Sequence, residues 1–191
     1  MSDTTVPVAP RGPPVLLTAE EFAARFAHVH AELVKGVVKE YPVPMPKHGF
    51  VCFRIALLVG THVEQNDLGR VMTNDSWIKT RSNPDTVRGA DVCFFSYERL
   101  PKGEVPEGLL SVVPELVFEV RSPSDRWPEI LVKVGEYLQA GVRVVVVVDP
   151  PTSSATVYRH EELHHTFHNG DPLTLPDVLP DFSVPVSRLF A

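Results

Sequence analysis

The alternation of apolar and polar residues marks a short strand between Pro114 and Pro123. Successive side chains of a strand point to opposite faces. Leu116, Phe118 and Val120 therefore share an apolar face, while the other face carries Val117, Glu119 and Arg121. Prolines bound the segment at both ends, as is typical of a strand limit. Since Glu119 and Arg121 are two residues apart, we expect a carboxylate and a cation to project side by side.

A second strand is predicted over residues 142–149, where Val144–Val148 form a continuous apolar run. Such a run suits a strand covered on both faces, in a parallel or mixed sheet with helices packed on it. A carboxylate at Glu119 in the neighbouring strand is then partly removed from water and needs a partner, a metal ion or a proton.

Between these two strands, apolar residues recur at helical spacing and predict a helix that ends at Gly141. Its core stripe is Ile130, Leu131, Val134 and Leu138, and an adjacent stripe is Glu129, Lys133 and Tyr137. Residues four apart on a helix can face the same neighbour. The resulting strand–helix–strand unit should have a right-handed crossover.

The remaining pattern predicts an N-terminal helix and hairpin before the sheet, and strands after it. Residues 1–16 are expected to form a flexible arm, and a capping box at Thr18–Glu21 opens a short helix. We expect further elements in this order: a hairpin over 32–41 turning at Lys35-Gly36, a helix over about 48–66 stopped by Gly69, strands at 71–80 and 87–95, a loop over 100–113 that overhangs a site, a hairpin over 155–168, and a tail over 172–191 that wraps over the surface.

Composition indicates one globular domain, residues 17–191, in a chain of 191 residues. The net charge of −6 argues against a broad basic surface that coats nucleic acid. Cys52 and Cys93 lack a CxxC arrangement, so free thiols are favoured over a disulfide or a zinc site. We see neither a signal peptide nor a stretch long enough to cross a bilayer, and expect a cytoplasmic protein.

Candidate chemistry centres on two carboxylates in apolar strands, Asp91 and Glu119, with Arg121 and Lys133 nearby. Alternation places Asp91 on one face with Gly89 and Cys93. Two carboxylates on adjacent strands can hold Mg²⁺, which prefers oxygen ligands, and a cation can offset charge on a phosphate oxygen. The alternative is that Glu119 only pairs with Arg121 or Lys133, and Lys133 only with Glu129 or Glu136.

Positive charge gathers around the Asp91 strand, at Lys79, Arg81, Arg88, Arg99 and Lys102. This cluster is the one hint of a nucleic-acid track in the sequence, and it is equally compatible with an ordinary surface. His48 lies at the start of a predicted helix, and the residues alone favour a capping or surface histidine.

Several motifs occur in an order that resembles the Uma-type putative restriction endonuclease family, within the PD-(D/E)XK nuclease superfamily. They are Glu32-Leu33-Val34-Lys35-Gly36, His48, Ala90-Asp91-Val92, Pro114 to Ser124, Lys133 to Val142, Val148-Asp149-Pro150, and the closing segment from Leu179 to Phe190. The resemblance implies an α/β fold with a restriction-endonuclease-like core, in which helices flank a central mixed β-sheet. It further implies DNA as substrate and Mg²⁺ or Mn²⁺ held by Asp91 and Glu119, with Glu32 and His48 near the same site.

Two departures from the family pattern affect the expected roles. Ala90 stands where the family usually has proline, and Arg121 stands at the superfamily's E-x-K lysine. Arginine stays protonated and is a poor base, so we prefer Lys133, which matches a helix lysine of the family, as the catalytic cation. Arg121 then contacts phosphate or pairs with Glu119, and Tyr137 supports the site.

Two functions follow from these residues. The first is a metal-dependent DNA endonuclease that uses Asp91, Glu119 and Lys133. The second is a nuclease-fold module that does not cut and serves in binding or assembly, as a homodimer. A small-molecule hydrolase has no motif behind it, since Gly-x-Ser-x-Gly does not occur.

Overall fold

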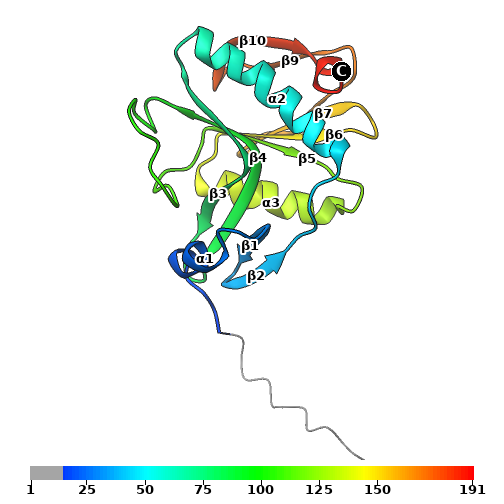
Figure 1. The fold of residues 1–191 in the computed structure, drawn as a ribbon. Helices are drawn as coiled ribbons and strands as arrows, with labels where there is room; N and C mark the ends of the chain where they lie inside the picture. The colour runs from blue at the N-terminus through cyan, green and yellow to red at the C-terminus, as the bar shows by residue number, and fades with distance from the viewer. Residues whose placement is uncertain (1–14) are drawn as a thin grey trace, which may run out of the picture.

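The computed structural model describes residues 15–191, which form a mixed sheet with helices on both faces (Figure 1). The predicted arm, residues 1–16, lies outside the described residues except for its last two. The helices are α1 (Ala19–Phe26), α2 (Pro46–Gln65), α3 (Trp127–Ala140) and the 3-10 helix η1 (Val186–Leu189). The strands are β1 (Ala31–Val34), β2 (Val37–Glu40), β3 (Gly69–Arg81), β4 (Thr86–Ser96), β5 (Leu116–Val120), β6 (Val144–Asp149), β7 (Ser154–Arg159), β8 (His165–Phe167), β9 (Pro172–Leu175) and β10 (Leu179–Pro185).

The main sheet contains eight of the described strands, in the order β2-β1-β4-β5-β6-β7-β8, with β3 also paired to β4. Only β5 and β6 run parallel among these pairs, and α3 connects them. The sheet is therefore mixed and flanked by helices, as predicted, and the strand–helix–strand unit is confirmed. The predicted hairpin after β6 is also present, with β8 at the edge of the sheet.

One edge of β4 has a gap in its strand pairing. Near the start of β4, Val87 pairs with Leu33 of β1, and further along Val92 pairs with Phe118 of β5. Between these points, none of the described strands pairs with Arg88–Asp91 on this edge. Backbone groups left unpaired in a buried sheet must find other partners. The gap therefore decides where polar side chains gather.

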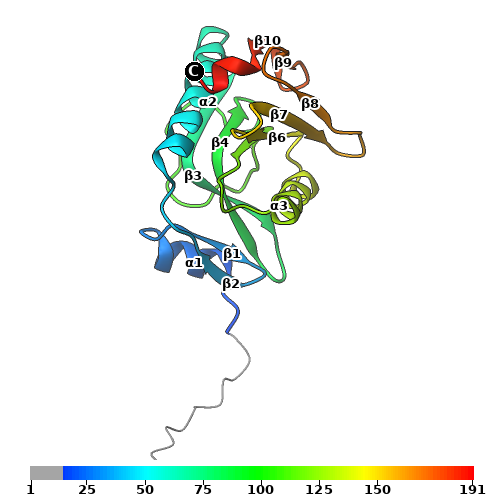
Figure 2. The ribbon, with the colours of Figure 1, turned by 90° about the vertical axis from the view of Figure 1, so that its right-hand side faces the viewer.

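Figure 2 shows α2 and α3 on opposite sides of the sheet, with α1, β1 and β2 at its lower end. The apolar face predicted for β5 packs toward α2, because Phe118 shares a buried cluster with Ile55 and Val59. Its other face packs toward α3, where Val117 meets Ile130 and Val134. Each face of β5 thus follows the alternation that the sequence predicts.

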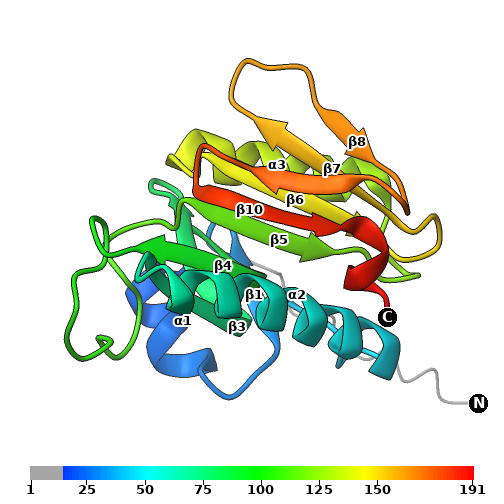
Figure 3. The same ribbon diagram turned by 90° about the horizontal axis from the view of Figure 1, so that it is seen from above.

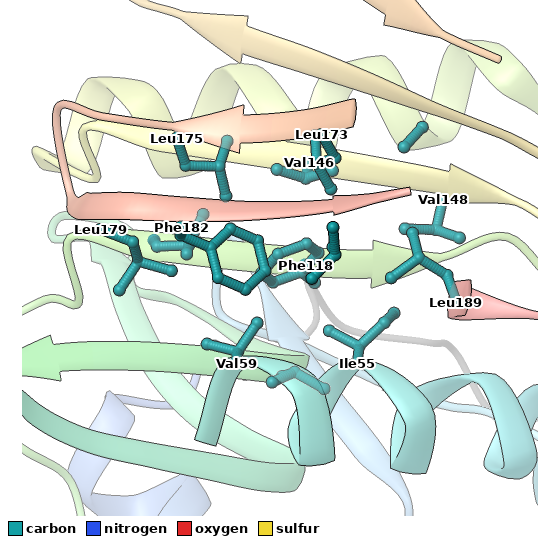
Figure 4. Packing of buried hydrophobic residues seen from close by; sticks show 14 of the residues in the cluster. Ile55, Val59, Phe118, Val146, Val148, Leu173, Leu175, Leu179, Phe182 and Leu189 are labelled. Carbon is teal, nitrogen blue, oxygen red and sulfur yellow. The ribbon is translucent and has the colours of Figure 1, made fainter. Parts of the chain in front are cut away.

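The C-terminal segment is part of the main core, and the prediction of a tail over the surface is wrong. Strands β9 and β10 form a second, two-stranded sheet that lies on the same side of the main sheet as α2 (Figure 3). Leu173, Leu175 and Leu179 are fully buried, and Phe182 is 3% exposed. Figure 4 shows these side chains packed against Phe118 and Ile55. Apolar residues alternate along both strands, and their burial supplies the second layer that the sheet needs.

Helix limits follow local chemistry, with two corrections. The capping box at Thr18 is present, and Gly141 ends α3 with φ of +102°. Helix α2 begins at Pro46, earlier than predicted, and it ends before Gly69, which instead begins β3. A Cβ at Gly69 would lie 2.0 Å from the Phe95 carbonyl oxygen, so the close approach of the two strands requires glycine there.

The expectation for the core stripe of α3 was also wrong. Leu131 is 48% exposed instead of lying in the core stripe of α3, and the fully buried Tyr137 takes part in that core. The loop over 100–113 covers a cavity of about 580 Å³ beside β3, which Trp77 and Val105 line and Glu119 and Lys133 do not. No helix of the described residues is long and apolar enough to cross a membrane.

Candidate active site

Side chains replace the missing strand along the gap in β4. The backbone N–H of Gly89 donates to Glu32 Oε1 at 3.1 Å. The Gly89 carbonyl oxygen accepts hydrogen bonds from Lys133 Nζ at 2.9 Å and from the Tyr137 hydroxyl at 3.2 Å. A carboxylate from β1 and two donors from α3 therefore meet at one residue of β4. This arrangement builds a polar site inside an apolar sheet.

Glu119 lies on the face of β5 that packs toward α3, and it is 9% exposed. Its Oε2 accepts from Lys133 Nζ at 2.7 Å, and its Oε1 lies 2.9 Å from the Tyr137 hydroxyl oxygen. Burial, together with the nearby Asp91 and Glu32, raises the pKa of Glu119 to about 8 despite the opposing effect of Lys133. Glu119 is therefore mostly neutral at pH 7 in the metal-free protein.

The hydroxyl of Tyr137 supports a neutral Glu119. This hydroxyl has one proton, yet it lies within hydrogen-bond distance of two oxygens, Glu119 Oε1 and the Gly89 carbonyl. A protonated Glu119 can donate to Tyr137, which then donates to Gly89, so that both contacts are satisfied. An ionised Glu119 leaves one of the two contacts without a proton.

Lys133 is a partly buried cation, and the alternative of a surface lysine paired with Glu129 or Glu136 is wrong. Its Nζ lies 3.0 Å from Glu32 Oε1, in addition to its contacts with Glu119 and Gly89. Burial alone would lower the pKa of Lys133, but the carboxylates of Glu119 and Glu32 raise it well above its usual range. Lys133 therefore stays protonated and can offset negative charge, but it cannot accept a proton.

An ion-pair network holds Glu32 in place through Arg88, which the sequence placed in the basic cluster. Arg88 Nη1 lies 2.7 Å from Glu32 Oε2, and its Nε lies 2.6 Å from Glu136 Oε2. Arg88 is only 6% exposed. Burial opposes ionisation of Glu32, but Lys133 and Arg88 together lower the pKa of Glu32 to about 2. Glu32 is thus a permanent anion that supports Lys133.

Asp91 lies at the end of the gap and connects β4, β5 and α2. Its Oδ2 accepts from the Val120 N–H at 2.6 Å, and its Oδ1 lies 3.0 Å from His48 Nε2. This position departs from simple alternation, since Cys93 packs toward α3 while Asp91 contacts a residue of α2. The pairing of β4 with β3 shifts register between Thr73 and Ser76, beside this position.

His48 is a site residue and not a helix cap. The N-cap of α2 is Met45, and the His48 side chain, 13% exposed, reaches Asp91. The hydrogen bond to Asp91 raises the pKa of His48, while burial opposes this rise. His48 therefore orients one oxygen of the Asp91 carboxylate.

Arg121 belongs to a separate contact, and the expected pair with Glu119 is not formed. Strand β5 ends at Val120, and Arg121 Nε lies 2.6 Å from Asp149 Oδ1 at the end of β6. The guanidinium also lies over the ring of Trp127, 5.6 Å from its centroid.

Most members of the basic cluster are paired with carboxylates of the chain itself. Four of its five members are engaged by carboxylates: Lys79 with Asp85, Arg88 with Glu32 and Glu136, Arg99 with Glu115, and Lys102 with Asp67. A basic side chain that is paired with a carboxylate attracts a phosphate backbone less strongly than an unpaired one.

Asp75 is a further carboxylate of this region, and no motif in the sequence identified it. It lies in the irregular part of β3, where Asn74 and Asp75 have φ of +62° and +54°. Burial and the charge of Asp91 raise the pKa of Asp75, and His30 Nε2 lies 3.3 Å from its carboxylate. Asp75 lies near Asp91 because of the register shift between Thr73 and Ser76, which no local sequence pattern predicts.

The donor set fits a hard divalent cation. Glu32, Glu119 and Glu136 pair with Arg88 or Lys133, while among the described residues Asp75 and Asp91 have only the histidines His30 and His48 as side-chain partners. Burial, together with the nearby Asp91 and Glu32, raises the pKa of Glu119, and a bound cation would relieve the repulsion between these carboxylates. Oxygen donors from Asp91 and Glu119 are those that Mg²⁺ and Mn²⁺ prefer.

Comparison with known proteins agrees with this fold. A family model described as Uma2, putative restriction endonuclease, matches residues 19–187. Among solved structures, the chain is similar to a putative nuclease of the DUF820 group from Anabaena variabilis ATCC 29413, with a TM-score of 0.78 and 18% identity over 91% of this chain and 97% of that one. No curated protein matches significantly.

Proposed function

The chain belongs to the Uma2 putative restriction endonuclease family, and we propose that it is a metal-dependent endonuclease that hydrolyses DNA phosphodiester bonds. The observation that carries this proposal is the convergence of Asp91, Glu119 and Lys133 at the gap in β4. Two carboxylates and a permanent cation are what metal-assisted phosphodiester hydrolysis needs.

Asp91 and Glu119 would hold the metal ion, Mg²⁺ or Mn²⁺. When bound, such an ion polarises a phosphoryl oxygen and lowers the pKa of its bound water. Glu119 must lose its proton to act as a ligand, so Tyr137 and Lys133, which contact its two oxygens, fix the carboxylate in place during this change. His48 does the same for Asp91.

Lys133 carries the positive charge of the site. It lies against Glu119 and Glu32, so that it can orient an attacking water and offset the charge that develops on the phosphate. Its raised pKa excludes a role as general base. Glu32 and Arg88 are positioning residues, because they contact Lys133 or each other.

Cleavage of supercoiled, linear and single-stranded DNA with Mg²⁺ or Mn²⁺ tests this proposal. We expect metal-dependent cutting that EDTA stops and that Glu119→Gln reduces by at least about 100-fold. Glu129→Gln is the matched control, since Glu129 is an exposed carboxylate of α3 that pairs with Arg126. Equal cutting by Glu119→Gln and the control would refute the assigned site.

One observation favours the second candidate, a module that binds or assembles without cutting. Both oxygens of Asp91 and both oxygens of Glu119 already have partners within the chain. Satisfied buried networks can be purely structural. If calorimetry detects no Mg²⁺ or Mn²⁺ binding and no DNA substrate is cut, the module is the correct function.

We propose that the protein acts as a homodimer in the cytoplasm. The two strands of a duplex are related by two-fold symmetry, so two copies related by a two-fold axis would present one site to each strand. An exposed apolar stripe on α2, formed by Phe50, Phe53 and Leu57, is the first surface to mutate. Light scattering of wild type and Phe53→Glu tests the assembly.

A further inference from the structure

A second set of donors meets at Asp91 from the side of α2. Cys52 follows His48 by four residues, so both side chains project from the same face of the helix. One ligand atom from each of His48, Cys52 and Asp91 lies within 4.8 Å of the others. Cys52 is partly buried and packs against the core on this side of the sheet.

The state of His48 is an independent observation at this place. Its Nε2 lies against Asp91, while its Nδ1 is buried and has no hydrogen-bond partner among the described residues. Buried polar atoms without a partner are uncommon in folded proteins. The imidazole therefore has an unused nitrogen in a region that also contains a thiol and a carboxylate.

We propose that His48, Cys52 and Asp91 form a mixed-donor site for a borderline divalent transition metal, of which Zn²⁺ is the expected occupant. A thiolate and an imidazole select zinc or cobalt, whereas Mg²⁺ prefers oxygen donors alone. Three protein ligands leave a fourth position for water, as is typical of open zinc sites. Binding replaces the thiol proton by the metal, and that proton passes to the solvent.

The surroundings favour a cation at this place. Asp75 lies close enough to Asp91 for the two carboxylates to repel each other, and a bound cation would relieve that repulsion. Two metals would compete for Asp91, because the site proposed for Mg²⁺ uses the same carboxylate. Zinc is therefore expected to inhibit magnesium-dependent cleavage. This regulatory part, unlike the site itself, rests on the proposed function.

Cobalt spectroscopy tests the site directly, on the full chain without DNA. Co²⁺ added to metal-stripped protein should give the near-ultraviolet charge-transfer band of a thiolate–cobalt bond. Zn²⁺ should abolish the band, and excess Mg²⁺ should not. Cys52→Ser should lose the band and bind Co²⁺ at least about 100-fold more weakly. Cys93→Ser is the matched control and should keep the band, since Cys93 is buried toward α3.

A measurement on wild-type protein guards against a variant that fails to fold. Zn²⁺ should protect Cys52 from alkylation, as mapped by mass spectrometry, and Mg²⁺ should not. A charge-transfer band that persists in Cys52→Ser, or no band and no protection in wild type, would overturn the site.

Inhibition by zinc is tested separately, by DNA cleavage. Zn²⁺ should inhibit cleavage by wild type, and each variant's inhibition is compared with its own rate without zinc. Weaker inhibition of Cys52→Ser supports competition for Asp91, and equal inhibition overturns it. A cobalt band in a protein that cuts no DNA supports the site while refuting the nuclease. Cleavage without a band supports the nuclease while overturning the site.

Discussion

Replacing Glu119 by glutamine tests whether this carboxyl is neutral in the metal-free protein. An amide has the shape of a protonated carboxyl, with an oxygen that can accept from Lys133 and an NH₂ that can donate to Tyr137. Tyr137 can then donate to the Gly89 carbonyl, as proposed for the wild type. We therefore expect Glu119→Gln to fold and to be more stable than wild type at alkaline pH.

The size of the effect follows from the pKa of Glu119, which lies at about 8 in the folded chain against an ordinary value of 4.5. Because the folded value is the higher one, the stability that this group contributes is fully present below pH 4.5 and is lost as the pH rises through about 8. At about 1.4 kcal/mol per pH unit, the interval sets an upper bound of roughly 5 kcal/mol. We expect about 2 kcal/mol, since relaxation raises the effective dielectric constant at buried sites.

The assay is urea unfolding of wild type and Glu119→Gln in EDTA, at several values from about pH 5.5 to about pH 8.5. The free-energy difference should grow in favour of the variant as the pH rises. Glu32→Gln is the matched control. Because Lys133 and Arg88 lower the pKa of Glu32 to about 2, its difference from wild type should be unfavourable and constant over this range. A constant difference for Glu119→Gln as well would refute a neutral Glu119.

Four other predictions concern Lys133, metal binding, Arg121 and the apolar core. Lys133→Met should lower the free energy of unfolding by about 3 kcal/mol, because it removes one of the two cations beside the buried Glu32 carboxylate and the hydrogen-bond donor to Glu119. Full cleavage by this variant would contradict the role of Lys133. Mg²⁺ binding at pH 7 should release about one proton per ion, since Glu119 must ionise. Calorimetry in two buffers of different ionisation enthalpy measures this proton release, and its absence would contradict a neutral Glu119. Arg121→Ala should cost about 1 kcal/mol in urea unfolding through its lost pair with Asp149, and a large loss of DNA cleavage would instead indicate a phosphate contact. Phe182→Ala should cost about 3–5 kcal/mol in urea unfolding because it opens a cavity in the core, and a loss below 1 kcal/mol would contradict its packing.

Elements whose signals are local could be predicted from the sequence. The faces of β5, the αL end of α3 at Gly141 and the capping box at Thr18 depend on residues a few positions apart. Periodicity of two or of 3.6 encodes which side of an element is apolar. The placement of Glu119 toward Lys133 and Tyr137 follows from such periodicity, once β5 and β6 are known to be joined by α3.

Which distant side chains meet depends on the packing of the whole chain. Glu32 reaches Gly89 across 57 residues of sequence because β1 stops pairing with β4 where the gap begins. Arg88, predicted on a basic surface, is buried for the same reason. Cys52 and Asp75 approach Asp91 through the packing of α2 and a register shift in β3. Strand register and helix packing are set by the sum of many long-range contacts, so no single segment of the sequence contains them.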